Sequence, residues 1–207
     1  MTYSKDDISA IILAGGQGRR LGGKNKGLLD IEGETFVTRL LSNLSTQTKT
    51  QIISANNDIS QYQQLNRTVI QDKNKNYQGP LSGIISCQAE IHTDLILTVP
   101  CDSPLIPTNL TEKLLLVYNQ NPKTRLCVVH DGERRQNLLM LFHRDLLENM
   151  QQYFQAGNRK VQTWIKQQNY SDVDFSKQAI NFTNINNESD MNRLLTLLKQ
   201  ENSRPQQ

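Results

Sequence analysis

The sequence predicts an α/β fold in which helices cover both faces of a mostly parallel β-sheet. Short apolar runs of strand length recur along the chain, at 10–15, 51–55, 68–72, 95–100 and 126–130. Segments with the spacing of amphipathic helices lie between them, at 36–44 and 110–117. Because the apolar runs are continuous rather than alternating, we expect strands that are buried on both faces, which is typical of a parallel sheet between two helical layers.

The second half of the chain predicts shorter elements. They are strands at 139–143 and 180–186 and helices at 145–155, at 159–168 and from Glu188 onward. The strand at 139–143 is a candidate for an antiparallel position at the edge of the sheet. No repeat and no linker rich in Gly, Pro or Ser divides the chain, so we expect one domain over 1–200 and a disordered polar tail at 201–207.

Composition excludes several classes of protein. A chain of 207 residues with 36% hydrophobic residues can bury one sizeable core. A net charge of +3 is too small to indicate a nucleic-acid-binding protein, so any anion site is expected to be local. Three cysteines without a C-x-x-C pair fit neither a disulfide framework nor a zinc site and favour a reducing cytoplasm. No signal peptide and no membrane span is recognisable, so no membrane association is expected.

The segment IILAGGQGRRLGGKNKG at 11–27 predicts an anion-binding loop. Several glycines, two arginines and two lysines follow an apolar strand there, at a cost in backbone entropy and charge repulsion that a bound anion would offset. A dinucleotide fingerprint fails at Leu21, and a P-loop fails at Asn25, where a hydroxyl residue would hold magnesium. The remaining interpretation is a loop whose backbone N–H groups wrap a nucleotide while two basic residues neutralise its phosphates.

The string LAGGQGRRLGGKNKG resembles the signature of nucleotidyltransferases that join an NTP to a phosphorylated acceptor. Within the nucleotide-diphospho-sugar transferase superfamily, the chain is most similar to the molybdenum cofactor guanylyltransferases. Further matches follow in the family's order, namely VIQD with Asp72, GPLSG at 79–83, PCDSPLIP with Asp102, VVHDGER at 128–134, FQAGNRKV at 154–161 and FTNINNESD at 182–190. The resemblance implies a Rossmann-like three-layer fold and transfer of GMP from GTP to the phosphate of molybdenum-molybdopterin, with release of pyrophosphate.

The resemblance also implies roles for particular residues. Arg20 and Lys26 are expected to face the phosphates, and Asp102 is expected to bind Mg²⁺ as the cofactor. The expected nucleotide-binding residues are Leu13, Ala14, Gly15, Gly16, Lys26, Ser54, Asp72, Gly79, Gly83 and Asp102. The expected acceptor-binding residues are Arg159, Lys160, Asn184 and Asn186. The expected partners are GTP and molybdenum-molybdopterin as substrates, together with proteins that mature molybdoenzymes.

Several of these roles compete with ordinary structural ones. Asp102 has the sequence context of a helix cap, and Asp72 that of a solvated turn acid. Arg159 and Lys160 equally fit the charged first turn of a helix. Asn184 and Asn186, spaced by two, would share a face of the short strand expected at 180–186.

Two departures from the family pattern leave points open. The family often has Asn where this chain has Ser54, so either Ser54 or Asn56 is expected to contact the nucleotide. Asn137 and Leu138 stand where the family tends to have a proline followed by a small or polar residue.

Two other functions fit the same motifs. One is a related cytidylyl- or sugar-1-phosphate nucleotidyltransferase, although the LAGG loop resembles the guanylyl type more closely. The other is a non-catalytic protein that binds a nucleotide or cofactor. The presence of Arg20, Lys26 and Asp102 favours an enzyme over the second alternative.

Overall fold

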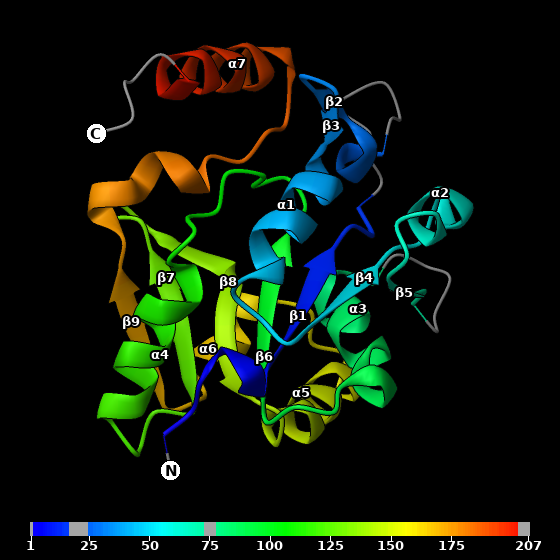
Figure 1. Cartoon of the computed structure of the whole chain (residues 1–207). Helices are drawn as coiled ribbons and strands as arrows, with labels where there is room; N and C mark the ends of the chain where they lie inside the picture. Colours follow the sequence, from blue (N-terminus) through cyan, green and yellow to red (C-terminus); the bar gives the residue numbers. More distant parts are fainter. Residues whose placement is uncertain (1, 17–24, 73–77, 203–207) are drawn as a thin grey trace.

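The computed structural model describes residues 2–16, 25–72 and 78–202, and these form a seven-stranded sheet between two layers of helices (Figure 1). The strand order is β5-β4-β1-β6-β8-β7-β9. The bounds are β1 Ile8–Leu13, β4 Thr50–Ser54, β5 Thr68–Ile70, β6 Leu95–Pro100, β7 Leu126–His130, β8 Arg135–His143 and β9 Tyr170–Asp174. Every strand of this sheet runs parallel to its neighbours except β8, which is antiparallel to β6 and β7. The predicted α/β fold is therefore confirmed.

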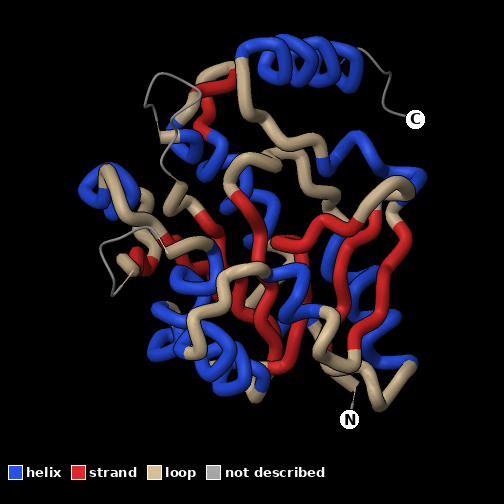
Figure 2. The backbone as a smooth tube through the Cα atoms, turned by 180° about the vertical axis from the view of Figure 1, so that it is seen from behind, coloured by secondary structure: helices blue, strands red, loops and turns tan. Residues whose placement is uncertain are grey.

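Helices cover both faces of the sheet, as Figure 2 shows from behind. One face carries α1 Phe36–Ser45 and α4 Leu110–Gln120, and the other carries α3 Pro80–Ser86, α5 Leu146–Gln155 and α6 Val161–Ile165. Strand β1 shows why both faces are apolar, because Ala10 and Ile12 pack with the α1 side while Ile11 packs with the α3 side. None of the helices in the described ranges is long and apolar enough to cross a bilayer.

A small hairpin and the last helix lie together beyond one edge of the sheet (Figure 1). The hairpin pairs β2 Asp30–Ile31 with β3 Glu34–Thr35, and the helix is α7 Glu188–Asn202. A third apolar cluster joins them through Ile31, Phe36, Ile185 and Leu194, which are at most 2% exposed. The helix predicted from Glu188 is confirmed, and residues 203–207 of the expected tail lie outside the described residues.

The parallel strands place their carboxyl ends at one edge of the sheet. Strand β1 lies between β4 and β6, so the chain moves outward from β1 to β5 and then crosses back to β6. Ligands of open α/β sheets bind at such a switch point, outside the carboxyl ends of the strands. Here Leu13 lies opposite Pro100, and the N–H of Cys101 donates to the carbonyl of Leu13 at 3.1 Å. The residues that follow β1 and β6 therefore begin side by side.

The strand expected at 139–143 is antiparallel, but its expected edge position is wrong. It belongs to the longer β8, which lies between β6 and β7 because its apolar side chains alternate between the two faces, with Leu141 on one and Met140 on the other. The edge position is taken by β9, a strand that the sequence analysis missed. The β9 sequence YSDVD contains one buried apolar side chain, Val173, and therefore gives no apolar run.

The structure corrects two further expectations about local structure. Residues 180–182, the start of the strand expected at 180–186, belong to the 3-10 helix η5 Ser176–Phe182, because Phe182 turns into the core against the ring of Phe175. The helix expected over 159–168 is α6, which begins at Val161 and has Lys160 in an extended conformation at its N-cap. Arg159 and Lys160 are therefore outside the first helical turn.

Candidate active site

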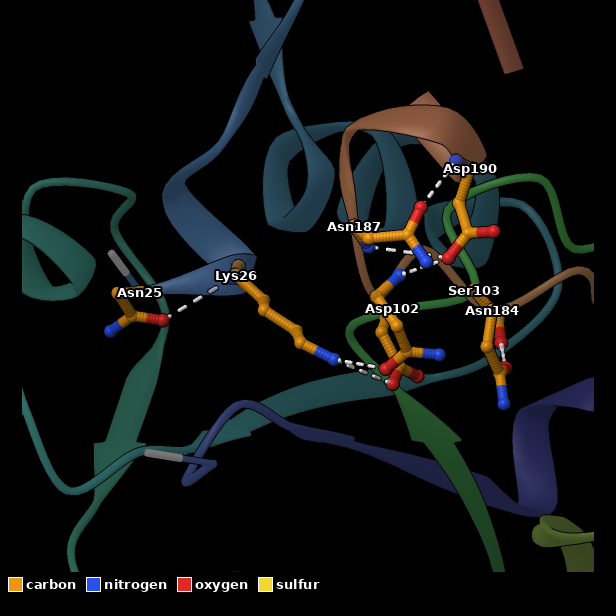
Figure 3. Close-up of polar contacts among 9 residues, drawn as sticks. Asn25, Lys26, Asp102, Ser103, Asn184, Asn187 and Asp190 are labelled. Carbon is orange, nitrogen blue, oxygen red and sulfur yellow. Dashed lines mark hydrogen bonds and ion pairs between the residues drawn. The ribbon is translucent and has the colours of Figure 1, made fainter. Parts of the chain in front are cut away.

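Lys26 and Asp102 meet beyond the carboxyl ends of β1 and β6. Lys26 Nζ lies 3.4 Å from Asp102 Oδ2, and the two side chains are 19% and 23% exposed (Figure 3). Burial raises the pKa of the Asp102 carboxyl, and the ammonium of Lys26 offsets part of that rise. The helix-cap alternative for Asp102 does not hold, because α4 begins at Leu110 and has Asn109 at its N-cap.

Asn186 completes this cluster from the far end of the chain. Lys26 Nζ donates a 2.5 Å hydrogen bond to Asn186 Oδ1. The N–H of Ile185 donates to the carbonyl oxygen of Asp102 at 2.8 Å, so the segment before α7 is attached to the turn after β6. Ser103 Oγ donates to Asn184 Oδ1 at 2.7 Å (Figure 3). The strand expected for these residues is absent from this described segment, yet Asn184 and Asn186 both reach the Asp102 turn.

The backbone around Lys26 is fixed by Asn25, the residue at which the P-loop pattern fails. Asn25 precedes the 3-10 helix η3 Lys26–Leu28, and its Oδ1 accepts hydrogen bonds from Gly27 N–H at 3.2 Å and from Tyr62 O–H at 2.7 Å. Its Nδ2 donates to Asp58 Oδ2 at 3.1 Å. Tyr62 is fully buried on the short helix α2 Ile59–Gln63, and burial raises its pKa.

Gly27 allows this arrangement, because a Cβ at this position would collide with the Tyr62 hydroxyl. The link from α2 to the residue before Lys26 therefore needs glycine one position after the lysine.

A second group of predicted residues gathers around Gly83 on α3. A Cβ at Gly83 would lie 2.6 Å from Ser54 Oγ, 3.4 Å from Asp72 Oδ1 and 3.6 Å from Leu13 Cδ2. Glycine is thus required for α3 to approach the ends of β4 and β1. The structure therefore brings Leu13, Ser54, Asp72 and Gly83 together, as the sequence analysis expected of one binding site.

Asp72 has one carboxylate oxygen that faces this group without a partner. Its Oδ1 is buried and has no hydrogen-bond partner among the described residues. Burial raises the pKa of Asp72, and hydrogen bonds from Asn56 and Ser82 counteract that rise in part. A buried carboxylate oxygen without a protein donor is suited to accept hydrogen bonds from a ligand.

Asn56 and Ser54 differ in exposure and in contacts. Ser54 is 2% exposed beneath Gly83. Asn56 is half-buried, its Oδ1 accepts the backbone N–H of Asp72 at 3.0 Å, and its Nδ2 would lie 3.0 Å from a Cβ at Gly15. Asn56 therefore bridges the loop after β1 and the end of β5.

The other residues expected to bind the nucleotide belong to the segment after β1 and to the start of α3. Ala14 continues the pairing of β1, because its N–H donates to the carbonyl of Ser54 at 2.8 Å. Gly16 is exposed at the start of the loop, and Gly79 has φ +88° immediately before Pro80, the first residue of α3. Arg20 lies in the segment 17–24, which is outside the described residues.

Arg159 and Lys160 lie on the α3, α5 and α6 side of the sheet, after α5. Arg159 is exposed, and its guanidinium carbon lies 3.9 Å from the ring centroid of Phe154. It also donates to the carbonyls of Phe154 and Asn158 and to Gln78 Oε1, each at 2.7 Å. Gln78 directly precedes Gly79, so Arg159 borders the entrance to α3 rather than the cluster around Lys26.

Asp102 is the one carboxylate in this cluster that could hold a metal ion with a nucleotide. Within the described ranges, no three His, Cys, Asp or Glu side chains come together as a metal-binding group. Mg²⁺ typically takes one or two carboxylates and fills the remaining positions with water and phosphate oxygens. The ammonium of Lys26 already stands at Asp102 Oδ2, which shows that the carboxylate accepts a cation at this place. The donor set therefore fits Mg²⁺.

Sequence reasoning missed four residues that shape this site, namely Asn25, Tyr62, Ser103 and Asp190. Asp190 Oδ2 accepts the backbone N–H groups of Asn186 and Asn187, at 2.8 and 3.2 Å, at the start of α7. The spacing N-x-x-D at 187–190 is a helix-capping signal that identifies Asp190 from sequence alone. No comparable sequence signal links Asn25 to Tyr62, which lie 37 residues apart.

The chain matches a known family over most of its length. Residues 10–173 match the family model of the MobA-like NTP transferase domain. The molybdenum cofactor guanylyltransferase of Shewanella frigidimarina is 38% identical over 189 residues, which are 91% of this chain and 96% of that protein.

Solved structures share the fold at low sequence identity. The molybdopterin-guanine dinucleotide biosynthesis protein A of Archaeoglobus fulgidus has a TM-score of 0.76 at 20% identity and covers 93% of this chain and 99% of its own. A CMP:2-keto-3-deoxy-manno-octonic acid synthetase has a TM-score of 0.69 at 13% identity and covers 96% and 100%. Enzymes that use different nucleotides thus share this fold, whereas the sequence match is to molybdenum cofactor guanylyltransferases. On that match, this chain is a nucleotidyltransferase that belongs to the molybdenum cofactor guanylyltransferase family and carries a MobA-like NTP transferase domain.

Proposed function

We propose that this protein transfers GMP from GTP to the phosphate of molybdenum-molybdopterin, forming the guanine dinucleotide cofactor and releasing pyrophosphate. One observation carries the proposal. At the switch point of the sheet, Lys26 Nζ is joined both to Asp102 and to Asn186. A cation, a carboxylate proposed to bind the metal, and an amide from the segment proposed to bind the acceptor therefore lie together where a nucleotide is expected.

The nucleotide is expected to lie over the ends of β1 and β4, against Gly83. Guanine presents an N–H and an amino group on one edge, and the unpartnered Asp72 Oδ1 is an acceptor for such donors. We assign the second polar contact to Asn56 rather than to Ser54, because Asn56 is more exposed and borders Gly15. Leu13 and the glycines after it leave room for the base and ribose.

Catalysis is proposed to rest on position and charge. The acceptor phosphate is already anionic, so its attack on the α-phosphorus requires no strong general base. Lys26 and Arg20 would stabilise the negative charge that develops on the departing pyrophosphate. The side chain of Lys26 is held for this role by Asn186 and Asp102, so little reorganisation is needed when GTP binds.

Asp102 is the residue that would hold Mg²⁺. When bound, the ion supplies positive charge to the phosphoryl oxygens of the reacting groups. Lys26 would remain positioned beside the ion through its hydrogen bond to Asn186.

The acceptor is proposed to contact two groups of residues that lie apart from each other. Asn184 and Asn186 offer amide groups beside Asp102, and Arg159, which Lys160 follows in the chain, offers positive charge beside Gln78 before α3. The protein is further proposed to act in the cytoplasm, where its three free and buried cysteines stay reduced. Proteins that mature molybdoenzymes are the proposed partners that deliver or receive the cofactor.

Incubation with molybdenum-molybdopterin, Mg²⁺ and each NTP in turn tests the reaction. We expect the guanine dinucleotide and pyrophosphate to form with GTP, and little product with CTP. A preference for CTP, or for a sugar 1-phosphate as acceptor, would instead identify the related nucleotidyltransferases. Tight GTP binding without turnover in the presence of acceptor would identify a non-catalytic binding protein.

The assignment of Asp102 has its own test. The Asp102→Ala variant is expected to lose Mg²⁺-dependent pyrophosphate release while remaining folded, because the carboxylate is at the edge of the core. Full activity in this variant would contradict the proposed metal site.

A further inference from the structure

We propose that Asp190 is a positioning residue for the transfer reaction, and that it acts by holding Asn186 against Lys26. The inference rests on the proposed function of the same site, and it adds a residue from α7 that contacts neither Lys26 nor Asp102 directly. Its basis is a chain of hydrogen bonds from the start of α7 to the ammonium of Lys26. Figure 3 shows Asp190, Asn187 and Lys26 around this segment.

The first link is the carboxylate of Asp190. Its Oδ2 accepts from the backbone N–H of Asn186 at 2.8 Å and from that of Asn187 at 3.2 Å. In return, the backbone N–H of Asp190 donates to Asn187 Oδ1 at 2.9 Å. An ordinary capping box satisfies the N-cap residue alone, whereas this carboxylate also holds the residue before it.

The second link is Asn186 itself. Its backbone is fixed by Asp190, and its side-chain Oδ1 accepts from Lys26 Nζ. An asparagine side chain is short, with two rotatable bonds, so the position of its amide follows the position of its backbone closely. Displacement of the Asn186 backbone would therefore withdraw one of the two contacts that hold the ammonium.

The residues before Asn186 are held by contacts of their own. Ile185 is fully buried in the cluster with Ile31 and Leu194, and Asn184 accepts from Ser103. These contacts fix residues 184 and 185, whereas the backbone N–H of Asn186 donates to Asp190. The family-model match covers residues 10–173, so Asn186 and Asp190 lie beyond the matched segment.

The test compares two carboxylates with the same local chemistry. Asp7 Oδ2 accepts the backbone N–H of Ser4 at 2.8 Å in a capping box at the opposite edge of the sheet. Asp190→Ala and Asp7→Ala therefore each remove an aspartate from a capping box, and only the first lies beside the site. Purified full-length variants are treated with an acylating reagent for lysine, and the modification rate of Lys26 is measured by peptide mass spectrometry.

We expect Lys26 to react about fivefold faster in Asp190→Ala, the factor that corresponds to one lost hydrogen bond, and at the unaltered rate in Asp7→Ala. Asn186→Ala should give the same acceleration, and the double variant Asn186→Ala with Asp190→Ala should show no further gain. Asp190→Asn, which keeps an acceptor oxygen, should react nearly as the unaltered protein does. With GTP and acceptor, kcat/KM should fall in the same order.

Either of two results would overturn the proposal. One is an unaltered Lys26 rate in folded Asp190→Ala, and the other is additive effects of Asn186→Ala and Asp190→Ala. If Asp190→Ala does not fold, Asp190→Ser takes its place, since its shorter hydroxyl reaches less far toward two amides, and the same two criteria apply. The labelling rate does not depend on catalysis, so failure of the guanylyltransferase assay alone would contradict the proposed function and leave this inference to be judged by labelling.

Discussion

The phenolic O–H of Tyr62 donates a 2.7 Å hydrogen bond to Oδ1 of Asn25 and so joins helix α2 to the residue before Lys26. Asn25 Oδ1 also accepts the N–H of Gly27, which makes this oxygen the common anchor of the turn that carries the lysine. The backbone turn that carries Lys26 is thus held from α2, and the ammonium of Lys26 is held by Asp102 and Asn186. In the proposed reaction, a lysine held at both ends would meet phosphate without further ordering.

The first prediction concerns this anchor. Tyr62→Phe removes the O–H while retaining the buried ring, so we expect a loss of about 1 kcal/mol in the free energy of unfolding and a lower kcat/KM for transfer. Urea unfolding and a pyrophosphate-release assay measure the two quantities. Tyr118→Phe is the matched control, since Tyr118 is 6% exposed on α4 beside Tyr3 and away from the site. Equal activity in both variants would show that the anchor does not affect catalysis.

The second prediction concerns the contact of α3 with β4. Gly83→Ala would place a methyl group 2.6 Å from Ser54 Oγ, so we expect destabilisation of about 1–3 kcal/mol and weaker GTP binding. Adding Ser54→Ala removes the hydroxyl that the methyl group meets and should recover much of the lost stability. Thermal unfolding of the two single variants and the double variant measures the coupling between the two substitutions. Additive effects on stability would contradict the close approach of Gly83 to Ser54 Oγ.

The third prediction concerns the pH dependence of stability through Asp72. Burial raises the pKa of this carboxyl in the folded protein above its value in the unfolded chain. The folded state therefore keeps the proton to higher pH, and stability falls as the pH rises from the unfolded pKa through the folded one. Asp72→Asn, which cannot ionise, should raise the unfolding temperature at about pH 7 but not at about pH 3, where the native carboxyl is also neutral.

The same variant separates stability from function. Asp72→Asn should weaken GTP binding at neutral pH, because the neutral amide lacks the negative charge that strengthens hydrogen bonds from the guanine donors. A variant with unaltered GTP affinity would remove Asp72 from the proposed base contact.

The fourth prediction concerns the acceptor side. Arg159→Ala should raise the KM for molybdenum-molybdopterin by about tenfold or more, as expected for a lost charge-assisted contact, and leave the KM for GTP unaltered. Steady-state kinetics with each substrate varied in turn measure the effect. Arg135→Ala is the control, because Arg135 pairs with Asp172 on β9, and an equal rise there would contradict a specific role for Arg159.

The α/β fold was predictable from the sequence, because apolar runs such as 10–15 and 95–100 are local patterns. Parallel strands bring their carboxyl ends to one edge, so the turn at Asp102 was expected beside the loop after β1. The family resemblance named Lys26 and the residues around Gly83, but the contact of Lys26 with Asp102 was not predicted.

The tertiary structure decided what holds these residues in place. Asn186 reaches Lys26 across 160 positions of sequence, and Tyr62 reaches Asn25 across 37. Strand β9 forms with a single buried apolar side chain because β7 offers it a free edge, and residues 176–182 become a 3-10 helix because Phe182 packs on Phe175. Periodicity reports only the local environment of a segment, whereas these contacts depend on where the rest of the chain has already packed.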